Sequence, residues 1–338
     1  MSEQPAQNDP IAVHIRRGAM NESLHHVHGV VATADGAVTT WGNADRLTMP
    51  RSAIKSIQVL PIIALGAAAE FDLSDDEIAL AAASHSAEPA HVQAVGSWLN
   101  RIGFSIDDLE CGPSDPISLD ATHDLYRSGD TPTAIHNCCS GKHSGFLTLA
   151  RYLQADPDFA LPGYLDPQHG VQRHVRDAQA LMTGVDLGSQ TPVIDGCGIP
   201  VYQFPLTNLA QAMARLVTPS AIPAIFKAAA ARVVDALPSR SFLVSGTGRG
   251  SHVLTKAATE PLIIKGGAEG VSMGALPSRG IGFALKCEDG AHRGVDEAAA
   301  ALLHHLGVLA EPLSVHAPLT NRAGTEVGDV VVDLAARA

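Results

Sequence analysis

A Ser-x-x-Lys motif near position 50 is the first pattern in the chain that could do chemistry. Ser52 and Lys55 lie within the segment PRSAIK, residues 50–55. On a helix, residues three apart share one face, so the hydroxyl and the amine can meet. A serine hydroxyl becomes an effective nucleophile when a neighbouring amine takes its proton. The lysine must be buried to act in this way, because its unperturbed pKa is about 10.4.

A short motif of this kind also occurs by chance, in which case residues 52–55 form an exposed helix turn. Two features favour the catalytic interpretation. The chain has only six lysines, and the motif follows a predicted strand where a helix should begin after Pro50. The first turn of a helix offers free N–H groups to a developing oxyanion. The apolar residues 59–69 could supply the wall that buries Lys55.

A second group of reactive side chains lies at residues 137–145, with the sequence NCCSGKHSG. Cys139 and Lys142 repeat the three-residue spacing, and His143 follows directly. A helix cap by Asn137 or Ser140 explains the polar residues. It does not explain a thiol, an amine and an imidazole side by side, so this segment is a candidate site.

Three further positions could contribute. Ser84, in ASHS at residues 83–86, is either a second reactive hydroxyl or a solvated cap. Asp195 and Cys197 stand in a turn bracketed by glycines and could be metal ligands. Lys265 ends a predicted strand in the sequence KGG, which parallels the Lys-Thr-Gly element of serine β-lactamases without its threonine.

Three histidines on a predicted strand, His25, His26 and His28, also suggest a metal. No second cluster of ligands in the sequence completes a site, so we interpret them as a polar strand face.

Composition limits the classes of function. Among 338 residues, 46% are apolar and 17% are charged, which is typical of a globular protein. The net charge is −12 with 23 lysines and arginines and no basic stripe, so nucleic acid and anionic membrane are not expected partners. Five cysteines, an odd number, argue against a disulfide framework and direct attention to thiol or metal chemistry.

The ends and apolar stretches of the chain predict a cytoplasmic location. The first ten residues are polar and acidic and lack the features of a secretory signal. The apolar stretch 59–69 is interrupted by Pro61 and is too short to span about 30 Å of hydrocarbon. We expect residues 1–10 to form a flexible tail.

These side chains must be positioned by strands from both ends of the chain and helices from its middle. Asp35-Gly36 is a turn signal between two apolar runs, which predicts a hairpin. Ser74 to Glu77 has the pattern of a capping box. We therefore expect an α+β fold with an antiparallel sheet formed from both chain ends and a helical region over one face. Strands are predicted at 11–16, 25–33, 37–41, 252–255, 262–265, 281–286 and 326–334, and helices at 78–83, 89–102, 142–153, 168–182, 206–216, 222–237 and 295–306.

Six segments, taken in order, resemble the rhizobial-type L-asparaginase family. Each is short, but the six together in this order are specific, and the similarity runs from about residue 12 to the C-terminus. The segments are PRSAIK (50–55), ASHSAEP (83–89), CSGKH (139–143), DGCGIP (195–200), SGTGR (245–249) and KGGAEG (265–270).

The resemblance implies a fold similar to serine β-lactamases and penicillin-binding proteins, with residues 11–338 as a single asparaginase domain, usually in a homodimer. It implies an amidohydrolase that converts L-asparagine to L-aspartate and ammonia. By matching position, Ser52 pairs with Lys55 and Ser84 with Lys265, and either serine could be acylated. The residues matching those that contact substrate are Arg51, His143 and Asp195.

The resemblance also implies a zinc ion near the substrate, held by Cys139, Lys142 and Cys197. Lysine is outside the usual set of zinc ligands. We therefore expect the ion to help position the substrate rather than to be required for hydrolysis. In this chain Cys138 stands where the family usually has asparagine, which could change metal affinity or sensitivity to oxidation. Residues 250–252, GSH, replace the aromatic-Asp-Thr usual in the family.

Three other functions remain open. A β-lactamase-like serine amidase or esterase would explain Ser52 and Lys55, but Ser-Asp-Asn, Tyr-x-Asn and Lys-Thr-Gly elements are missing. A zinc- or amino-acid-binding protein without turnover would use the same residues. A thiol enzyme would use Cys139 as its nucleophile.

Overall fold

The computed structural model describes residues 9–334 and divides into two compact units, each described here by itself. Unit 1 comprises residues 1–53, 203–218 and 253–338, and unit 2 comprises residues 54–202 and 219–252. Most of the expected N-terminal tail, residues 1–8, lies outside the described residues. The single domain expected for residues 11–338 stays a prediction.

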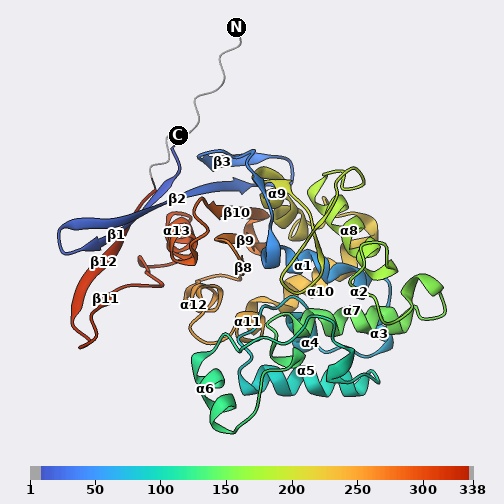
Figure 1. The fold of residues 1–338 in the computed structure, drawn as a ribbon. Helices are drawn as coiled ribbons and strands as arrows, with labels where there is room; N and C mark the ends of the chain where they lie inside the picture. The colour runs from blue at the N-terminus through green and yellow to red at the C-terminus, as the bar shows by residue number, and fades with distance from the viewer. Residues whose placement is uncertain (1–8, 335–338) are drawn as a thin grey trace. The chain divides into compact units, whose positions relative to one another are not determined.

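Unit 1 contains an antiparallel sheet made from both chain ends, which confirms the α+β fold class. The strand order is β11-β12-β1-β2-β10-β9-β8, and β3 pairs with β2 off this path (Figure 1). The strands are β1 (Ile11–Arg17), β2 (Met20–Ala32), β3 (Ala37–Trp41), β8 (Ile263–Gly267), β9 (Val271–Leu276), β10 (Ile281–Cys287), β11 (Leu319–Thr320) and β12 (Glu326–Asp333). A short separate pair joins β4 (Leu47–Thr48) to β7 (Phe204–Pro205).

The terminal strands β1 and β12 pair with each other toward the β11 edge of the sheet. The predicted hairpin is confirmed: β2 and β3 are antiparallel, with Gly29 opposite Trp41. Gly29 has no room for a side chain, since a Cβ there would lie 2.9 Å from Leu285. The register of β2 is therefore fixed by close packing as well as by its turn.

Helices cover both faces of the sheet within unit 1, not one face as expected. On β10, Gly282 packs against the backbone of α9 (Leu206–Leu216), where a Cβ would lie 2.2 Å from Ala210 O. The next residue, Phe283, belongs to the buried cluster that includes α13 (His292–His305). Because successive side chains on a strand point to opposite faces, α9 and α13 lie on opposite sides.

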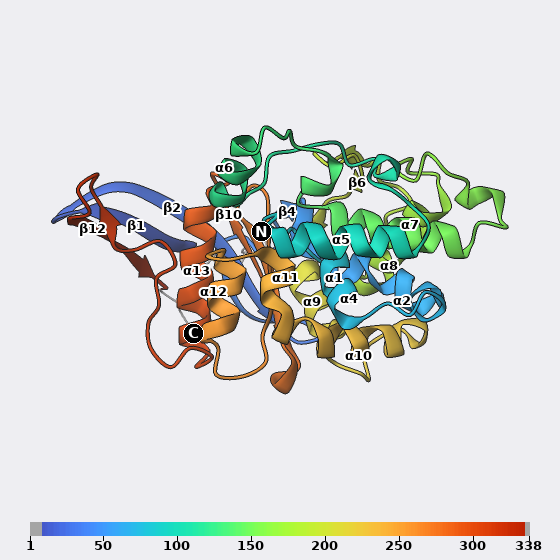
Figure 2. The same cartoon turned by 90° about the horizontal axis from the view of Figure 1, so that it is seen from below.

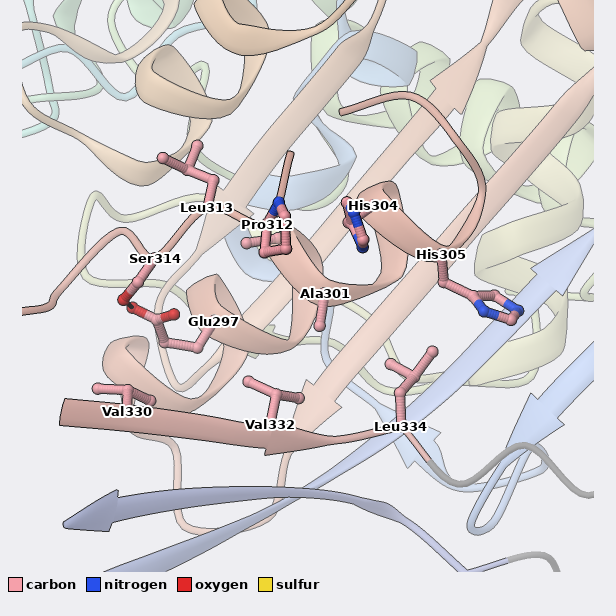
Figure 3. A pocket seen from close by; sticks show the side chains of 11 residues that line it. Glu297, Ala301, His304, His305, Pro312, Leu313, Ser314, Val330, Val332 and Leu334 are labelled. Carbon is pink, nitrogen blue, oxygen red and sulfur yellow. Dashed lines mark hydrogen bonds between the residues drawn. The ribbon is translucent and has the colours of Figure 1, made fainter. Parts of the chain in front are cut away.

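An open groove runs between α13 and β12 (Figure 3). At one end of it Glu297 is only 2% exposed. Its Oε1 accepts hydrogen bonds from Ser314 Oγ and His316 N, both at 2.7 Å. This buried carboxylate thereby attaches the segment before β11 to α13. Other side chains lining the groove include those of Ala301, His304, His305, Val330, Val332 and Leu334.

Unit 2 is mainly helical, with one short strand pair. Its longer helices are α4 (Asp75–Ala81), α5 (Pro89–Arg101), α6 (Leu119–Arg127), α7 (Ser140–Tyr152), α8 (Gly170–Thr183) and α10 (Lys227–Ala236). Shorter elements are α1 (Lys55–Gln58), α2 (Leu60–Ala64), α3 (Ala67–Glu70), α11 (Ser241–Ser245), β5 (Val193–Ile194) and β6 (Pro200–Val201). The helices α5 and α7 lie side by side (Figure 2).

Helix α7 is the centre of unit 2. Its residues from Ser140 to Ala150 are all buried, so it is enclosed by neighbours rather than amphipathic. Gly141 lets α4 approach, because a Cβ there would lie 2.4 Å from Leu80 O. The predicted capping box of α4 is confirmed, with Ser74 and Glu77 bonding each other's backbone N–H groups.

One predicted strand is wrong, and the unpredicted elements include β9 and α6. Residues 252–255 belong to α12 (Gly250–Ala257), where Leu254 and Ala258 contact one apolar core at helical spacing despite the β-branched residues around them. Strand β9 is buried throughout, so it lacks alternation. Helix α6 has no buried residue to give it an apolar period. Among residues 9–334, no helix has the length and apolar character needed to span a membrane.

Candidate active site

The Ser-x-x-Lys motif lies in a tight turn that continues into a helix. Ser52 is in a 3₁₀ turn, η1 (Arg51–Ile54), and Lys55 begins α1. Arg51 has a φ of +48°, a left-handed conformation that is uncommon for a residue with a side chain. Such strain persists only where the surroundings impose it, and it often marks functional sites.

In unit 1, strand β8 packs directly against the turn that carries Ser52. A Cβ on Gly267 would lie 2.6 Å from Pro50 O and 3.3 Å from Ser52 N. Lys265 is two residues earlier, on the same face of β8. Its side chain is buried, with Nζ donating to Gly266 O at 2.5 Å. Unit 1 therefore brings Lys265 and Ser52 to one region of the fold.

In unit 2, the amine of Lys55 is buried among three acceptors. The residue is 1% exposed, and Nζ lies 2.9 Å from Ser84 Oγ, 3.1 Å from Cys139 Sγ and 2.5 Å from Ala83 O. An ammonium group has three N–H donors, and these three partners match them. If the amine loses a proton, its lone pair is within proton-transfer distance of the Ser84 hydroxyl.

Ser84 is held in place by its own backbone. Its N–H donates to Val244 O at 2.9 Å, and the residue is buried. The neighbouring His85 donates from Nε2 to Ser140 Oγ at 2.9 Å, since its Nδ1 accepts from Ala87 N. The pairing expected from the resemblance joins Ser84 to Lys265, which belongs to unit 1. That pairing and the pairing of Ser52 with Lys55 stay predictions.

The predicted metal ligands converge in unit 2. Lys142 Nζ lies 3.0 Å from Cys197 Sγ, and both residues are buried. Hydrogen bonds from the thiols of Cys138 and Cys197 lower the pKa of Cys139 well below that of an ordinary thiol. The positive charges of Lys55 and Lys142 act in the same direction, and the combined effect exceeds that of burial.

Cys139 also shifts the pKa values of the two neighbouring residues, Cys197 and Lys142. The hydrogen bond with Cys139, followed by burial, raises the pKa of Cys197. Burial opposes the charge on Lys142, but the attraction of Cys197 and Cys139 outweighs it and raises the pKa of the amine. Thiolates are preferred ligands of zinc, so two adjacent buried thiols with an amine beside them fit that ion.

Two predicted substrate contacts, His143 and Asp195, lie in unit 2. His143 is fully buried on α7, with Nδ1 2.9 Å from the hydroxyl of Tyr164. Its Nε2 has no hydrogen-bond partner among residues 9–334. Burial lowers the pKa of His143 well below its usual value, so the ring is neutral. Asp195 is half-buried in the turn before Cys197, and its negative charge favours the charged form of Lys142.

The structure adds Tyr164 to the group of polar residues. Its hydroxyl accepts from Glu110 N at 2.8 Å while it contacts His143. Burial raises the pKa of this tyrosine strongly, so the hydroxyl stays protonated. In the sequence, Tyr164 stands between a glycine and a leucine, and no motif there predicts its contact with His143.

Comparison with known families agrees with the motif order. A family model described as L-asparaginase II matches residues 13–332. The chain belongs to this family. Membership confirms the resemblance and makes the chain an amidohydrolase of this family. No curated protein matches this asparaginase-family chain.

Two solved structures are similar to this member of the family at low sequence identity. A Bacillus subtilis glutaminase, YbgJ, determined as a covalent complex with 5-oxo-L-norleucine, has 13% identity and a TM-score of 0.39, over 84% of this chain and 88% of that one. A protein named Mglu has 16% identity and a TM-score of 0.40, over 84% of this chain and 67% of that one.

Proposed function

We propose that the protein is an L-asparaginase that hydrolyses L-asparagine to L-aspartate and ammonia through an acyl-enzyme on Ser52. Family membership supports an amidohydrolase. The observation that supports a serine–lysine mechanism is the burial of Lys55, whose amine lies 2.9 Å from the hydroxyl of Ser84. The choice of Ser52 as the acylated serine rests on the Ser-x-x-Lys motif. A desolvated lysine beside a hydroxyl is the arrangement that activates a serine.

The proposed reaction has two halves. The neutral amine of Lys55 takes the proton of Ser52, and the oxygen attacks the side-chain amide carbon of asparagine. The C–N bond breaks, the proton passes to the leaving nitrogen, and ammonia departs. Water then attacks the aspartyl ester, and the C–O bond to Ser52 breaks to give aspartate. Ser84 and Lys265 act as the second pair, which passes protons.

Charged and polar residues account for recognition of a small amino acid. In the proposal, Arg51 binds the α-carboxylate and Asp195 the α-ammonium group of the substrate. His143 offers a neutral ring nitrogen, Nε2, that is otherwise unpartnered among the described residues. A site that hydrogen-bonds both ends of its ligand discriminates strongly against analogues lacking either group.

Cys139, Lys142 and Cys197 would hold a zinc ion. When bound, the ion would supply positive charge that helps position the substrate. Hydrolysis itself is assigned to the serine and lysine side chains. A homodimer and a cytoplasmic location are part of the same proposal and rest on the family resemblance and on composition.

The mechanism is tested by replacing the two serines separately. We expect Ser52→Ala to abolish ammonia release and to leave no acyl-enzyme detectable by mass spectrometry after rapid acid quenching. Ser84→Ala should slow turnover but still form the adduct. An adduct that persists in Ser52→Ala and disappears in Ser84→Ala would transfer the nucleophile role to Ser84.

Metal removal tests the secondary role of zinc. Dialysis against a chelator should raise KM for asparagine while leaving measurable kcat, because the ion is assigned to positioning only. Complete loss of turnover on chelation, restored by zinc, would contradict that assignment.

A thiol mechanism is the second candidate, because Cys139 has a strongly lowered pKa and lies 3.1 Å from the Lys55 amine. A low pKa makes a thiol reactive. In that case iodoacetamide would inactivate the enzyme, asparagine would protect it, and Cys139→Ala would remove the acyl adduct that Ser52→Ala leaves intact.

A further inference from the structure

Unit 1 contains a compact group of ligand-type side chains outside the proposed active-site residues. His25 on β2, Cys287 at the end of β10 and Asp289 in the following turn each place one ligand atom within 4.8 Å of the others. His25 and Cys287 are buried, and the side chain of Asp289 is about half exposed. Imidazole, thiolate and carboxylate are the three side-chain types that bind zinc.

The sheet, rather than the sequence, completes this group. Strand β10 pairs with β2 so that Cys287 lies opposite Val27, and Glu288 N continues the ladder to His26 O at 2.9 Å. Asp289 is thereby carried to His25, 264 residues away in the chain.

The three histidines of β2 do not form one polar face, contrary to the sequence-based interpretation. His25 lies toward the apolar core that contains Cys287, as alternation along the strand requires. His28 Nε2 lies 2.7 Å from Glu288 Oε1, and His26 Nδ1 lies 3.7 Å from Glu288 Oε2. The adjacent carboxylates of Glu288 and Asp289 therefore contact histidines on opposite faces of β2.

Two hydrogens converge on the carboxylate of Asp289. His25 Nδ1 lies 2.6 Å from Oδ2, and Cys287 Sγ donates to Oδ1 at 3.0 Å. A divalent cation could replace both hydrogens, since its ligands would be His25 Nδ1, Cys287 Sγ and the carboxylate of Asp289. One thiolate and one carboxylate would balance its two positive charges, and the open side of Asp289 would leave a fourth position for water.

The first turn of α13 fits closely over this group. A Cβ on Gly294 would lie 2.7 Å from Cys287 Sγ and 2.9 Å from His25 Cβ. Asp289 Oδ1 also accepts from Ala291 N at 2.9 Å, which fixes the carboxylate before the helix begins. The three ligand atoms are therefore held by two strands, a turn and a helix rather than by a flexible loop.

Arg293 competes with a metal at this position. Its Nη2 and Nε lie 3.1 Å and 3.3 Å from His25 Nε2, so Nε2 accepts and Nδ1 carries the proton. A metal on Nδ1 requires that proton to move to Nε2, where it would face the guanidinium. Arg293 must then turn away, toward Ser23 Oγ, which it already approaches at 3.4 Å.

We propose that His25, Cys287 and Asp289 form a metal site for Zn²⁺ or a similar divalent transition ion, separate from the set Cys139, Lys142 and Cys197. On binding, Cys287 releases its thiol proton to solvent, and the proton of His25 moves from Nδ1 to Nε2. The three ligand atoms then bind the ion, which links β2 to the turn before α13. This site does not depend on the proposed asparaginase activity.

The test uses the full chain with Cys139→Ser and Cys197→Ser, so that the other proposed metal set is absent. Metal-free protein is titrated with Co²⁺, and the sulfur-to-cobalt charge-transfer absorption is followed together with competition by Zn²⁺. We expect about one ion per chain with thiolate absorption. Adding Cys287→Ser should remove that absorption, and adding Asp289→Asn should weaken binding about 10-fold or more.

Two further variants make the result specific. Glu288→Gln changes the neighbouring carboxylate, which contacts His28. It should leave the stoichiometry and affinity of Co²⁺ binding unchanged. Arg293→Gln should tighten binding, because a glutamine oxygen can accept the proton on Nε2 where a guanidinium cannot.

Circular dichroism establishes that each variant is folded, and Asp289→Asn keeps the test decisive if Cys287→Ser does not fold. Absence of thiolate absorption in the Cys139→Ser, Cys197→Ser protein would overturn the proposal. So would binding that neither Cys287→Ser nor Asp289→Asn affects.

Discussion

At the scale of single residues, chemistry is concentrated on a few buried polar groups. Lys55 and Lys142 are each 1% exposed, although lysine is almost never fully buried without partners. Their partners are a serine hydroxyl, a carbonyl and two thiols. Burial of a charge on this scale costs several kcal/mol unless it is paired, so these contacts indicate function rather than stability.

Replacing Lys55 tests whether its amine is the base. Lys55→Met keeps an unbranched side chain of similar length but removes the amine that contacts Ser84. We expect kcat to fall by about 10²–10⁴-fold, the usual contribution of a general base, with a smaller change in KM. Lys227→Met, at an exposed position on α10, is the matched control and should have normal kinetics. A Lys55→Met enzyme with near-normal kcat would exclude this role.

The sequence predicted the residue types of the site but not their contacts. Ser-x-x-Lys spacing suggested that Lys55 meets Ser52, which stays a prediction. The contacts of Lys55 with Ser84 and Cys139, which are far away in the chain, were not predicted. Tyr164 and Asp289 had no recognisable motif, since each matters only because of a partner brought close by the fold.

At the scale of elements, helices with a clear hydrophobic period could be predicted from the sequence. Features that depend on a distant packing partner could not. Elements with a clear period were predicted well: α9 has the predicted bounds, and α5 ends one residue early. Strand β9 was missed because it is buried on both faces. Its Gly274 is needed because a Cβ would lie 2.2 Å from the ring of Phe283. Such constraints depend on a distant partner and cannot be read from local sequence.

Gly267 on β8 tests whether the position of the turn matters for catalysis. In Gly267→Ala, the new Cβ would lie 2.6 Å from Pro50 O and 2.9 Å from Ala53 N, so β8 or the turn carrying Ser52 must move. A displacement of about 1 Å near reacting groups can cost on the order of 10²-fold in rate.

We therefore expect kcat/KM for the Gly267→Ala enzyme to fall by about that factor while the fold is retained. Gly36→Ala, where a Cβ meets no atom within 4 Å, is the control and should be unaffected. Unchanged kinetics in Gly267→Ala would mean that the turn does not position the nucleophile.

At the scale of the whole molecule, buried neutral histidines make stability depend on pH. Burial, followed by the nearby His91 and Lys55, lowers the pKa of His85 from 6.5 to about 3. Between these values the unfolded chain binds a proton on this side chain and the folded chain does not. Acidification through this range therefore favours unfolding, by up to about 1.4 kcal/mol per pH unit for one such group.

Urea unfolding of the wild-type chain at several pH values from neutrality to about pH 5 should show this loss of stability. His85→Gln should reduce the slope of unfolding free energy against pH. His123→Gln, at an exposed position on α6, should not. An identical slope in His85→Gln and wild type would show that His85 does not stay neutral in the folded protein.

The central claim, that this amidohydrolase is an L-asparaginase acting through Ser52, is tested most directly by ammonia release. Purified wild type and Ser52→Ala would be assayed with L-asparagine and L-glutamine, and with nitrocefin as a β-lactam probe. The account predicts ammonia from L-asparagine with wild type, little or none from L-glutamine, no nitrocefin cleavage, and no activity in Ser52→Ala. Hydrolysis of L-glutamine in preference to L-asparagine, or full asparaginase activity in Ser52→Ala, would contradict it.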